Sequence, residues 1–307
     1  MPAWLDEIVD EQPLLLPGHA ACAGCGPAIG IRHLLGGLAA AAPERKTVLV
    51  IPASCWTIVA GVWPVNAFGV SVYLTPFASA AAEASGIKAA LRLRGRGETN
   101  VVVWGGDGST CDIGFSGVSA AAERNEDVIY VLNDNEAYMN TGVQKSGATP
   151  EGAWTTTTPV AAPRAGRKKD MIRIMAAHGI PYAATLALGS VPMVRDFRAK
   201  VARAAEIEGF RFLHVLGGCP PGWRYPTERT TELARLAVET DYFPLVECDH
   251  GEWRTTLRPK RTLPVREFLA GQGRFAHLAD EQVASIQEHV EARRRLLARE
   301  EQNGAPA

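Results

Sequence analysis

Residues 100–108 read NVVVWGGDG and residues 128–142 read VIYVLNDNEAYMNTG, and these two segments decide the fold of the 307-residue chain. Each begins with an apolar, β-branched run that is typical of a buried parallel strand. Asn135 comes 27 residues after Gly108, which is about the length of one helix and a return strand. We therefore expect Asp107 and Asn135 to lie at the same carboxyl edge of a sheet, where ligands bind in α/β folds.

Similar apolar runs alternate with segments rich in Ala and Leu, which predicts an α/β fold with a mostly parallel sheet and helices on both faces. The predicted strands are Thr47–Ile51, Asn100–Trp104, Val128–Leu132 and Phe212–Leu216. The predicted helices are Pro27–Ala40, Ala78–Leu93, Phe115–Arg124, Asp170–His178, Val191–Ala205 and Thr230–Thr240. Beyond Asp249 the composition becomes charged, and Glu281–Glu301 has an amphipathic, Arg-rich helix pattern. We predict one large domain over residues 1–250 and a charged helical C-terminal extension over residues 251–307.

Composition excludes several classes of protein. The chain has 32 basic and 33 acidic residues, so it carries no electrostatic footprint for nucleic acid or anionic lipid. Residues 1–19 include four acidic side chains and only a short apolar run, which fits neither a secretory signal nor a transit peptide, and we expect a cytoplasmic protein. Residues 47–82 contain no Lys, Arg, Asp or Glu, but Pro52, Pro64 and Pro76 interrupt them. A membrane span is therefore not expected, and this uncharged stretch belongs in the core, around a cofactor or against another subunit.

The residues after the two central strands suit a diphosphate and a metal ion. Gly106 and Gly108 flank Asp107 and let the backbone approach a diphosphate, and the next helix points its N-terminus at the anion. The Asp107 carboxylate, the Asn135 side-chain oxygen and the Ala137 carbonyl would give Mg²⁺ three oxygen ligands, which diphosphate oxygens and water complete. Gly-Asp-Gly alone is a common turn, so the second segment carries the prediction. A dinucleotide site is the main rival, but no Gly-x-Gly-x-x-Gly follows a strand here.

Four cysteines occur where an iron–sulfur cluster needs ligands. Cys22 and Cys25 form a Cys-x-x-Cys embedded in glycine, and Cys55 and Cys219 each follow a predicted strand. Two ligands from one loop and one from each of two others make a set fit for a [4Fe–4S] cluster.

A Cys-x-x-Cys also occurs in redox sites and in zinc sites. A redox dithiol usually follows a strand near the start of a small domain, and a zinc site needs a second matched pair, which the chain lacks. The remaining cysteines, Cys111 and Cys248, are expected to be plain buried thiols.

Taken together, these motifs resemble the β subunit of pyruvate:ferredoxin oxidoreductases, over roughly residues 15 to 250. The matching strings include GHAACAGCG (18–26), DNEAYMNTG (134–142) and CPPGW (219–223). The resemblance implies a thiamine-diphosphate-binding fold of the pyrophosphate type, with Asn140 beside the thiazolium and substrate as the catalytic residue. It implies [4Fe–4S] ligation by Cys22, Cys25, Cys55 and Cys219, and Mg²⁺ ligation by Asp107, Asn135 and Ala137. The cofactor-binding residues implied are Gly106, Asp107, Gly108, Ser109, Asn135, Ala137, Asn140 and Gly142.

The resemblance also implies a reaction and partners. Thiamine diphosphate serves as an electron sink, so the expected reaction is the coenzyme A-dependent oxidative decarboxylation of a 2-oxoacid, with electrons passing through iron–sulfur clusters to ferredoxin. Pyruvate is the favoured substrate. Branched-chain, aromatic and other 2-oxoacids remain alternatives, because Trp154 and Gly217-Gly218 differ from the residues that are commonest in pyruvate-type sequences. The glutamate that activates the cofactor is expected from an α-type subunit, and a ferredoxin-like subunit should carry the electrons away. The uncharged residues 47–82 are our candidate for the shared surface.

Two alternatives come from other classes. An iron–sulfur or zinc module without chemistry of its own would explain the cysteines but not Asp107, Asn135 or Asn140. A self-sufficient thiamine-dependent decarboxylase would explain the metal motif but leave the cysteines without a role.

Overall fold

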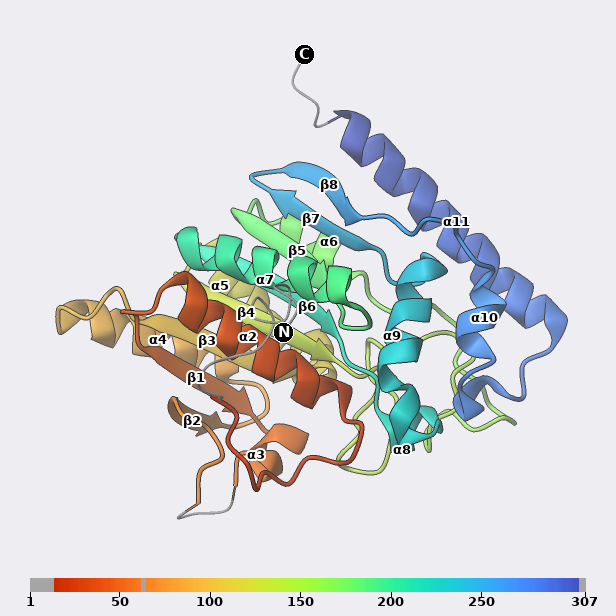
Figure 1. Ribbon diagram of the computed structural model, residues 1–307, viewed down its shortest axis with the longest axis horizontal. Helices are drawn as coiled ribbons and strands as arrows, with labels where there is room; N and C mark the ends of the chain where they lie inside the picture. The colour runs from red at the N-terminus through yellow and green to blue at the C-terminus, as the bar shows by residue number, and fades with distance from the viewer. Residues whose placement is uncertain (1–13, 62–64, 304–307) are drawn as a thin grey trace, which may run out of the picture.

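The computed structural model describes residues 14–61 and 65–303, which build an eight-stranded sheet in the order β2-β1-β3-β4-β6-β5-β7-β8 (Figure 1). The first six strands in the chain pair in parallel, and the last two are antiparallel. The strands are β1 (Thr47–Pro52), β2 (Ser71–Thr75), β3 (Asn100–Gly106), β4 (Val128–Asp134), β5 (Tyr182–Leu186), β6 (Phe210–Leu216), β7 (Leu245–Asp249) and β8 (Glu252–Leu257). The predicted α/β class and mostly parallel sheet are confirmed.

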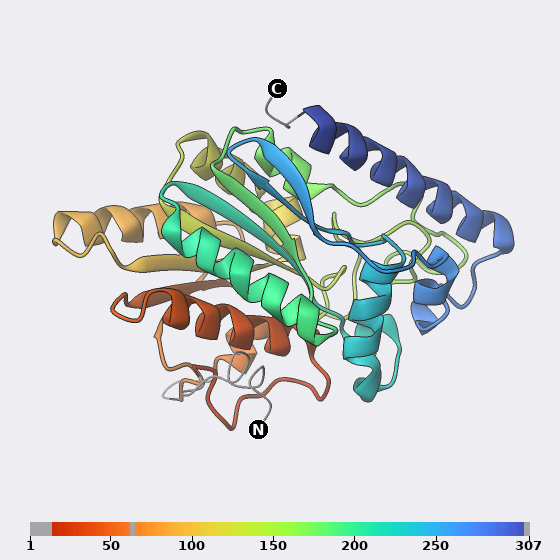
Figure 2. The same cartoon turned by 45° about the horizontal axis from the view of Figure 1, so that its top comes forward.

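Helices cover both faces of the sheet, because the central strands are apolar on both sides. Along β3, Val102 and Trp104 face one core and Val101 and Val103 face the other. The first core is closed by α2 (Gly26–Ala41) and α7 (Val191–Glu206), which lie side by side in Figure 2. The second is closed by α4 (Ala80–Leu93), α5 (Phe115–Glu123) and α6 (Met171–Ala176).

A third apolar cluster lies beyond the carboxyl edge of the sheet. It is built by short helices and loops after β6 together with the C-terminal helices (Figure 1). The elements are α8 (Pro220–Trp223), α9 (Thr230–Glu239), α10 (Val265–Leu269), η3 (Gly273–Phe275) and α11 (Asp280–Asn303), while the short η2 (Thr227–Arg229) only precedes α9 and has no buried residue. This cluster packs the C-terminal segment against the part of the molecule that holds the predicted site.

The predicted strands and helices are all present, with ends that shift by a few residues. Four strands were not predicted, namely β2, β5, β7 and β8, and neither were the short helices α3 (Cys55–Val59), α8 and α10. The predicted C-terminal helix is confirmed as α11, while the domain boundary at residue 250 stays a prediction and falls in the turn between β7 and β8. No helix within residues 14–61 and 65–303 is both long and apolar enough to cross a bilayer.

Candidate functional site

Four neighbouring strands each lead into a predicted site residue. Cys55 follows β1, Asp107 follows β3, Asn135 follows β4 and Cys219 comes after β6. These strands are consecutive in the sheet, in the order β1-β3-β4-β6, and all are parallel. The expectation that neighbouring strands deliver Asp107 and Asn135 to one edge is confirmed.

A pocket opens at this edge, with an empty volume of about 610 Å³ that includes open solvent at its mouth. Its lining includes the predicted cofactor residues Gly106, Asp107, Gly108, Ser109, Asn135, Ala137 and Asn140. The predicted cluster ligand Cys55 lines it too, as do Ser54, Phe77, Asn133, Tyr138 and Met139, which were not predicted. Gly142 lies outside the lining, in a turn where its φ of +115° is a conformation that favours glycine.

The oxygens in this pocket fit a hard cation. Asp107 is buried, and burial together with the charge of Asp134 raises the pKa of its carboxyl group well above the ordinary value. The Asn135 side-chain oxygen is buried and has no hydrogen-bond partner among the residues described. A buried carboxylate and an unpaired amide oxygen are costly unless something pairs with them. Mg²⁺ would hold Asp107 ionised and give the Asn135 oxygen a partner.

One carboxylate oxygen of Asp107 already accepts a hydrogen bond from the protein. The Ser146 hydroxyl donates to Asp107 Oδ2 at 2.5 Å, so this side chain has a defined orientation. Within residues 14–61 and 65–303, no three His, Cys, Asp or Glu side chains are grouped to hold a single metal ion. A magnesium site here would instead combine one carboxylate with amide, carbonyl and diphosphate oxygens.

The loop after β3 is held close to the opposite wall of the pocket. The hydroxyl groups of Ser109 and Thr110 both donate to the Gly106 carbonyl, at 2.9 and 2.8 Å. Gly108 has no room for a side chain, because a Cβ there would lie 2.2 Å from the Tyr138 ring. A π-helical turn, η1 (Ser109–Ile113), then leads into α5.

The four predicted cluster ligands lie near one another on three segments of the chain, with Cys55 as the first residue of α3. The Gly26 amide donates to the Gly218 carbonyl at 3.0 Å, and a Cβ on Gly26 would lie 2.6 Å from the Gly218 nitrogen, so the Cys25 and Cys219 loops press together. Burial raises the pKa of the Cys25 thiol to about 12, and the charges of the other three cysteines add to the rise. Burial likewise raises the pKa of Cys219 to about 11.

This grouping fits a cluster better than a single ion. Each cysteine of a [4Fe–4S] cluster binds a different iron, so its thiols stand further apart than the ligands of one metal. The positive charge of iron would offset the mutual repulsion of the thiolates and keep the coordinating thiols deprotonated. Cys111 and Cys248 are buried as predicted.

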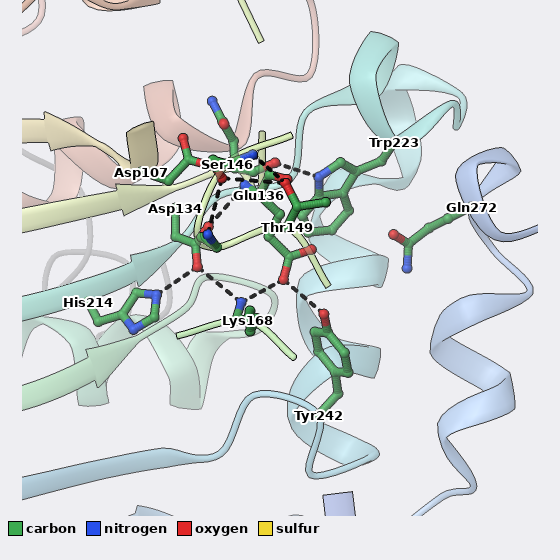
Figure 3. A network of polar contacts seen from close by, with 12 residues as sticks. Asp107, Asp134, Glu136, Ser146, Thr149, Lys168, His214, Trp223, Tyr242 and Gln272 are labelled. Atoms are coloured by element: carbon green, nitrogen blue, oxygen red, sulfur yellow. Dashed lines mark hydrogen bonds and ion pairs between the residues drawn. The ribbon is translucent and has the colours of Figure 1, made fainter. Parts of the chain in front are cut away.

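A buried network of charges behind the pocket was not predicted from the sequence (Figure 3). Asp134 and Glu136 are fully buried, and Lys168 Nζ lies between them, 3.0 Å from Asp134 Oδ2 and 2.7 Å from Glu136 Oε1. His214 Nε2 lies 2.8 Å from the same Asp134 oxygen. Burial raises the pKa of Asp134, but Lys168 and His214 outweigh it and lower the pKa to about 2.

The one local signal for this network was a pair of carboxylates directly after an apolar strand, which requires buried cations nearby. The sequence could not show which cations, because they come from distant segments.

Comparison with known proteins agrees with the geometry. Residues 55–215 match the family model described as "Thiamine pyrophosphate enzyme, C-terminal TPP binding domain". The chain is 45% identical to the pyruvate synthase subunit PorB of Methanothermobacter marburgensis, covering 92% of this chain and 97% of that protein. It is also 45% identical to the ketoisovalerate oxidoreductase subunit VorB of Pyrococcus abyssi, covering 89% and 88%.

A solved structure has the same fold. It is a 2-oxoglutarate:ferredoxin oxidoreductase from Magnetococcus marinus with 2-oxoglutarate, coenzyme A and succinyl-CoA bound. The TM-score is 0.57 at 21% identity, with 92% of this chain and 94% of that chain covered.

Proposed function

Because this chain belongs to the family of thiamine-diphosphate-binding β subunits of 2-oxoacid:ferredoxin oxidoreductases, we propose that it catalyses the coenzyme A-dependent oxidative decarboxylation of pyruvate as part of a multi-subunit complex. The products are acetyl-CoA and CO₂, and the two electrons pass through iron–sulfur clusters to ferredoxin. The chain's own cofactors in this proposal are thiamine diphosphate, Mg²⁺ and one [4Fe–4S] cluster.

The observation that carries the proposal is that the two predicted sites adjoin each other. Cys55 lines the same pocket as Asp107 and Asn135, and the charge of Asp107 adds to the effect of burial in raising the pKa of the Cys55 thiol. Thiamine diphosphate stabilises the electrons that decarboxylation leaves behind, and an adjacent cluster can accept them. A decarboxylase without electron transfer has no use for a cysteine set at this position.

The described residues have distinct roles in this proposal. Asp107, the Asn135 side chain and the Ala137 carbonyl hold Mg²⁺, while Gly106, Gly108 and Ser109 receive the diphosphate. Asn140 is exposed and lines the pocket, and in this proposal it acts beside the thiazolium ring and the substrate. Cys22, Cys25, Cys55 and Cys219 hold the cluster, and Gly142 shapes the turn that follows Asn140.

Partner subunits complete the site in this proposal. Strand β2 is at the edge of the sheet, and its Tyr73 and Leu74 side chains are 47% and 48% exposed. Ile58 on α3 is 52% exposed, and all three belong to the uncharged residues 47–82. Exposed apolar side chains and an open strand edge are features of a contact surface. We place the α-type subunit, with its activating glutamate, on this surface, and a ferredoxin-like subunit near the cluster.

The choice of pyruvate rests on the names of relatives. A ketoisovalerate oxidoreductase subunit is as similar as a pyruvate synthase subunit, at 45% identity each, so a branched-chain 2-oxoacid is the second candidate. The cytoplasmic location stays a prediction.

The test is to purify the complex anaerobically and to measure iron, acid-labile sulfide and thiamine diphosphate in one sample. We expect about four irons per copy of this chain above the partners' share, with one thiamine diphosphate, and ferredoxin reduction that needs coenzyme A and is faster with pyruvate than with ketoisovalerate. Thiamine diphosphate without iron would contradict the cysteine assignment and the electron transfer with it.

A further inference from the structure

The loop that carries two proposed magnesium ligands has an unusual backbone at its centre. Asn135 and Ala137 flank Glu136, whose φ is +67°. This left-handed conformation is uncommon for a residue other than glycine and persists only when the surroundings hold it. The contacts of Glu136 therefore decide where the two ligands lie.

Every polar group of Glu136 has a partner. The backbone amide donates to Asp134 Oδ1 at 2.9 Å, and the backbone carbonyl accepts from Thr149 Oγ1 at 2.7 Å. The carboxylate accepts three hydrogen bonds, from Lys168 Nζ at 2.7 Å, Tyr242 OH at 2.9 Å and Arg274 Nη2 at 2.5 Å. Figure 3 shows the Lys168 and Tyr242 side chains converging on this carboxylate. The side chain is thus fixed from the side away from the pocket.

Arg274 acts on two residues of this loop. It belongs to η3 in the C-terminal segment and is 2% exposed. Its guanidinium group lies 4.0 Å from the centre of a Trp223 ring, and the Trp223 indole N–H donates to the Asn135 carbonyl at 2.7 Å. Its Nε donates to Gln272 Oε1 at 2.9 Å, which orients the planar group. Arg274 therefore holds Glu136 directly and Asn135 through Trp223.

The charges in this network balance. The two buried carboxylates of Asp134 and Glu136 face the two cations of Lys168 and Arg274. Removing one member of a buried ion pair leaves an uncompensated charge, which is strongly destabilising for the local structure. Loss of Arg274 would thus release Glu136 from its strained conformation and shift the ligands on either side.

We propose that Glu136 and Arg274 are positioning residues that set the magnesium-binding geometry of residues 135–137, with Arg274 as the contribution of the C-terminal segment to the site. The inference rests on the proposed function, because it assumes that Mg²⁺ binds here. Partners that orient metal ligands typically contribute 10-fold to 100-fold in metal affinity, which sets the size of the expected effect.

The test compares Glu136→Gln, Arg274→Gln and Arg274→Lys in the assembled complex. The complex is depleted of Mg²⁺, and the Mg²⁺ concentration for half-maximal thiamine diphosphate binding is measured by titration calorimetry. We expect this concentration to rise about 10-fold to 100-fold in Glu136→Gln and Arg274→Gln, and less in Arg274→Lys, which keeps the charge but not the planar fork. Saturating Mg²⁺ should restore cofactor binding, a rescue that general unfolding would not allow.

Two comparisons keep the outcome clear. Arg266→Gln breaks an exposed ion pair with Asp280 in the same C-terminal segment and should leave the Mg²⁺ requirement unchanged. In the double variant Glu136→Gln/Arg274→Gln, the Mg²⁺ requirement should rise by less than the product of the two single fold-changes, since the two side chains contact each other. An unchanged Mg²⁺ requirement in both single variants, with iron content and assembly intact, would overturn the proposal. If the unsubstituted complex bound neither Mg²⁺ nor thiamine diphosphate, the proposed function would fail instead.

Discussion

At the scale of single residues, the cysteines are the sharpest test of the site. The fold brings together Cys22, Cys25, Cys55 and Cys219 from three segments of the chain, so each should supply one ligand. We expect Cys→Ala at any of the four positions to remove the [4Fe–4S] cluster, measured as iron content and as the spin signal of the reduced cluster in an anaerobic preparation.

The matched control is Cys248→Ala, because Cys248 is a buried thiol on β7 and outside the predicted set. It should keep the full iron content. Retention of all iron in Cys55→Ala would remove Cys55 from the set. Cys55 is the most informative of the four, because it also lines the pocket that contains Asp107 and Asn135.

Asp127 offers a stability prediction away from the pocket. It lies 2.8 Å from Lys88 Nζ and pairs with Arg211, and both cations are almost completely buried. Burial raises the pKa of Asp127, but the hydrogen bonds and charges of Lys88 and Arg211 outweigh it and hold the pKa below the ordinary 3.8. The stabilisation is thus present in full at pH values above 3.8 and is lost as the pH falls through the lowered pKa.

We expect Asp127→Asn to lower the free energy of unfolding by about 3 kcal/mol at pH 7, since it leaves two buried cations without a carboxylate. The difference from the unsubstituted chain should shrink when denaturant unfolding is repeated below pH 4. Glu126→Gln is the control, because Glu126 pairs with the half-exposed Arg124 and should change stability little at either pH. A difference that stays constant with pH would contradict the ion-pair explanation.

At the scale of elements, the sequence was sufficient to predict the strands that are buried on both faces. β3 and β4 are continuous apolar runs, so their pattern predicts central parallel strands. β2 was missed because only its last residue, Thr75, is buried, and β5 (YAATL) because two of its residues are alanines, which disfavour strands. β7 and β8 carry charged residues that pair across strands, such as the buried Glu247 with Arg254.

The residues of the candidate site also fall into two groups, those that the sequence predicts and those that it does not. Residues next to the ends of central strands, such as Asp107 and Asn135, could be located because topology alone brings them together. Lys168 and Arg274 could not, since nothing in their local sequence distinguishes them from surface cations. Their role depends on a long loop and a C-terminal turn folding back on one buried loop.

The exposed apolar side chains on α3 and on the edge strand β2 lead to a prediction about assembly. Ile58→Asp on α3 and Leu74→Asp on β2, made separately, should weaken assembly with the α-type subunit, because each puts a charge into an apolar contact surface. Co-purification measures the loss, and the thermal midpoint of the chain should change little for substitutions at exposed positions. Leu93→Asp is the matched control, because Leu93 is 91% exposed at the end of α4 and outside the uncharged residues. Normal assembly of both variants would argue against this surface.

At the scale of the whole molecule, the C-terminal segment is part of the site's support. Strand β8 extends the sheet, and Arg173 on α6 pairs with Glu300 on α11 at 2.8 Å. Helices α10 and α11 share the third apolar cluster with Trp223 and Tyr242, which donate hydrogen bonds to Asn135 and Glu136. The segment therefore supports residues 135–137 from behind, while the front of the pocket stays open.

The open front leads to a prediction for the whole chain. Among residues 14–61 and 65–303, Asp107 is the only carboxylate that lines the pocket, and in our proposal it is bound to Mg²⁺. The described part of the pocket thus has no free carboxylate to activate the aminopyrimidine ring of the cofactor. We expect the chain alone to bind thiamine diphosphate with Mg²⁺ but not to accelerate exchange of the thiazolium C2 proton with solvent. Adding the α-type subunit should raise the exchange rate, followed by NMR in deuterated buffer, by at least the roughly 100-fold typical of a positioned acid or base. Fast exchange in the chain alone would mean that one of its own groups removes the proton, and the partner would then serve assembly and substrate recognition only.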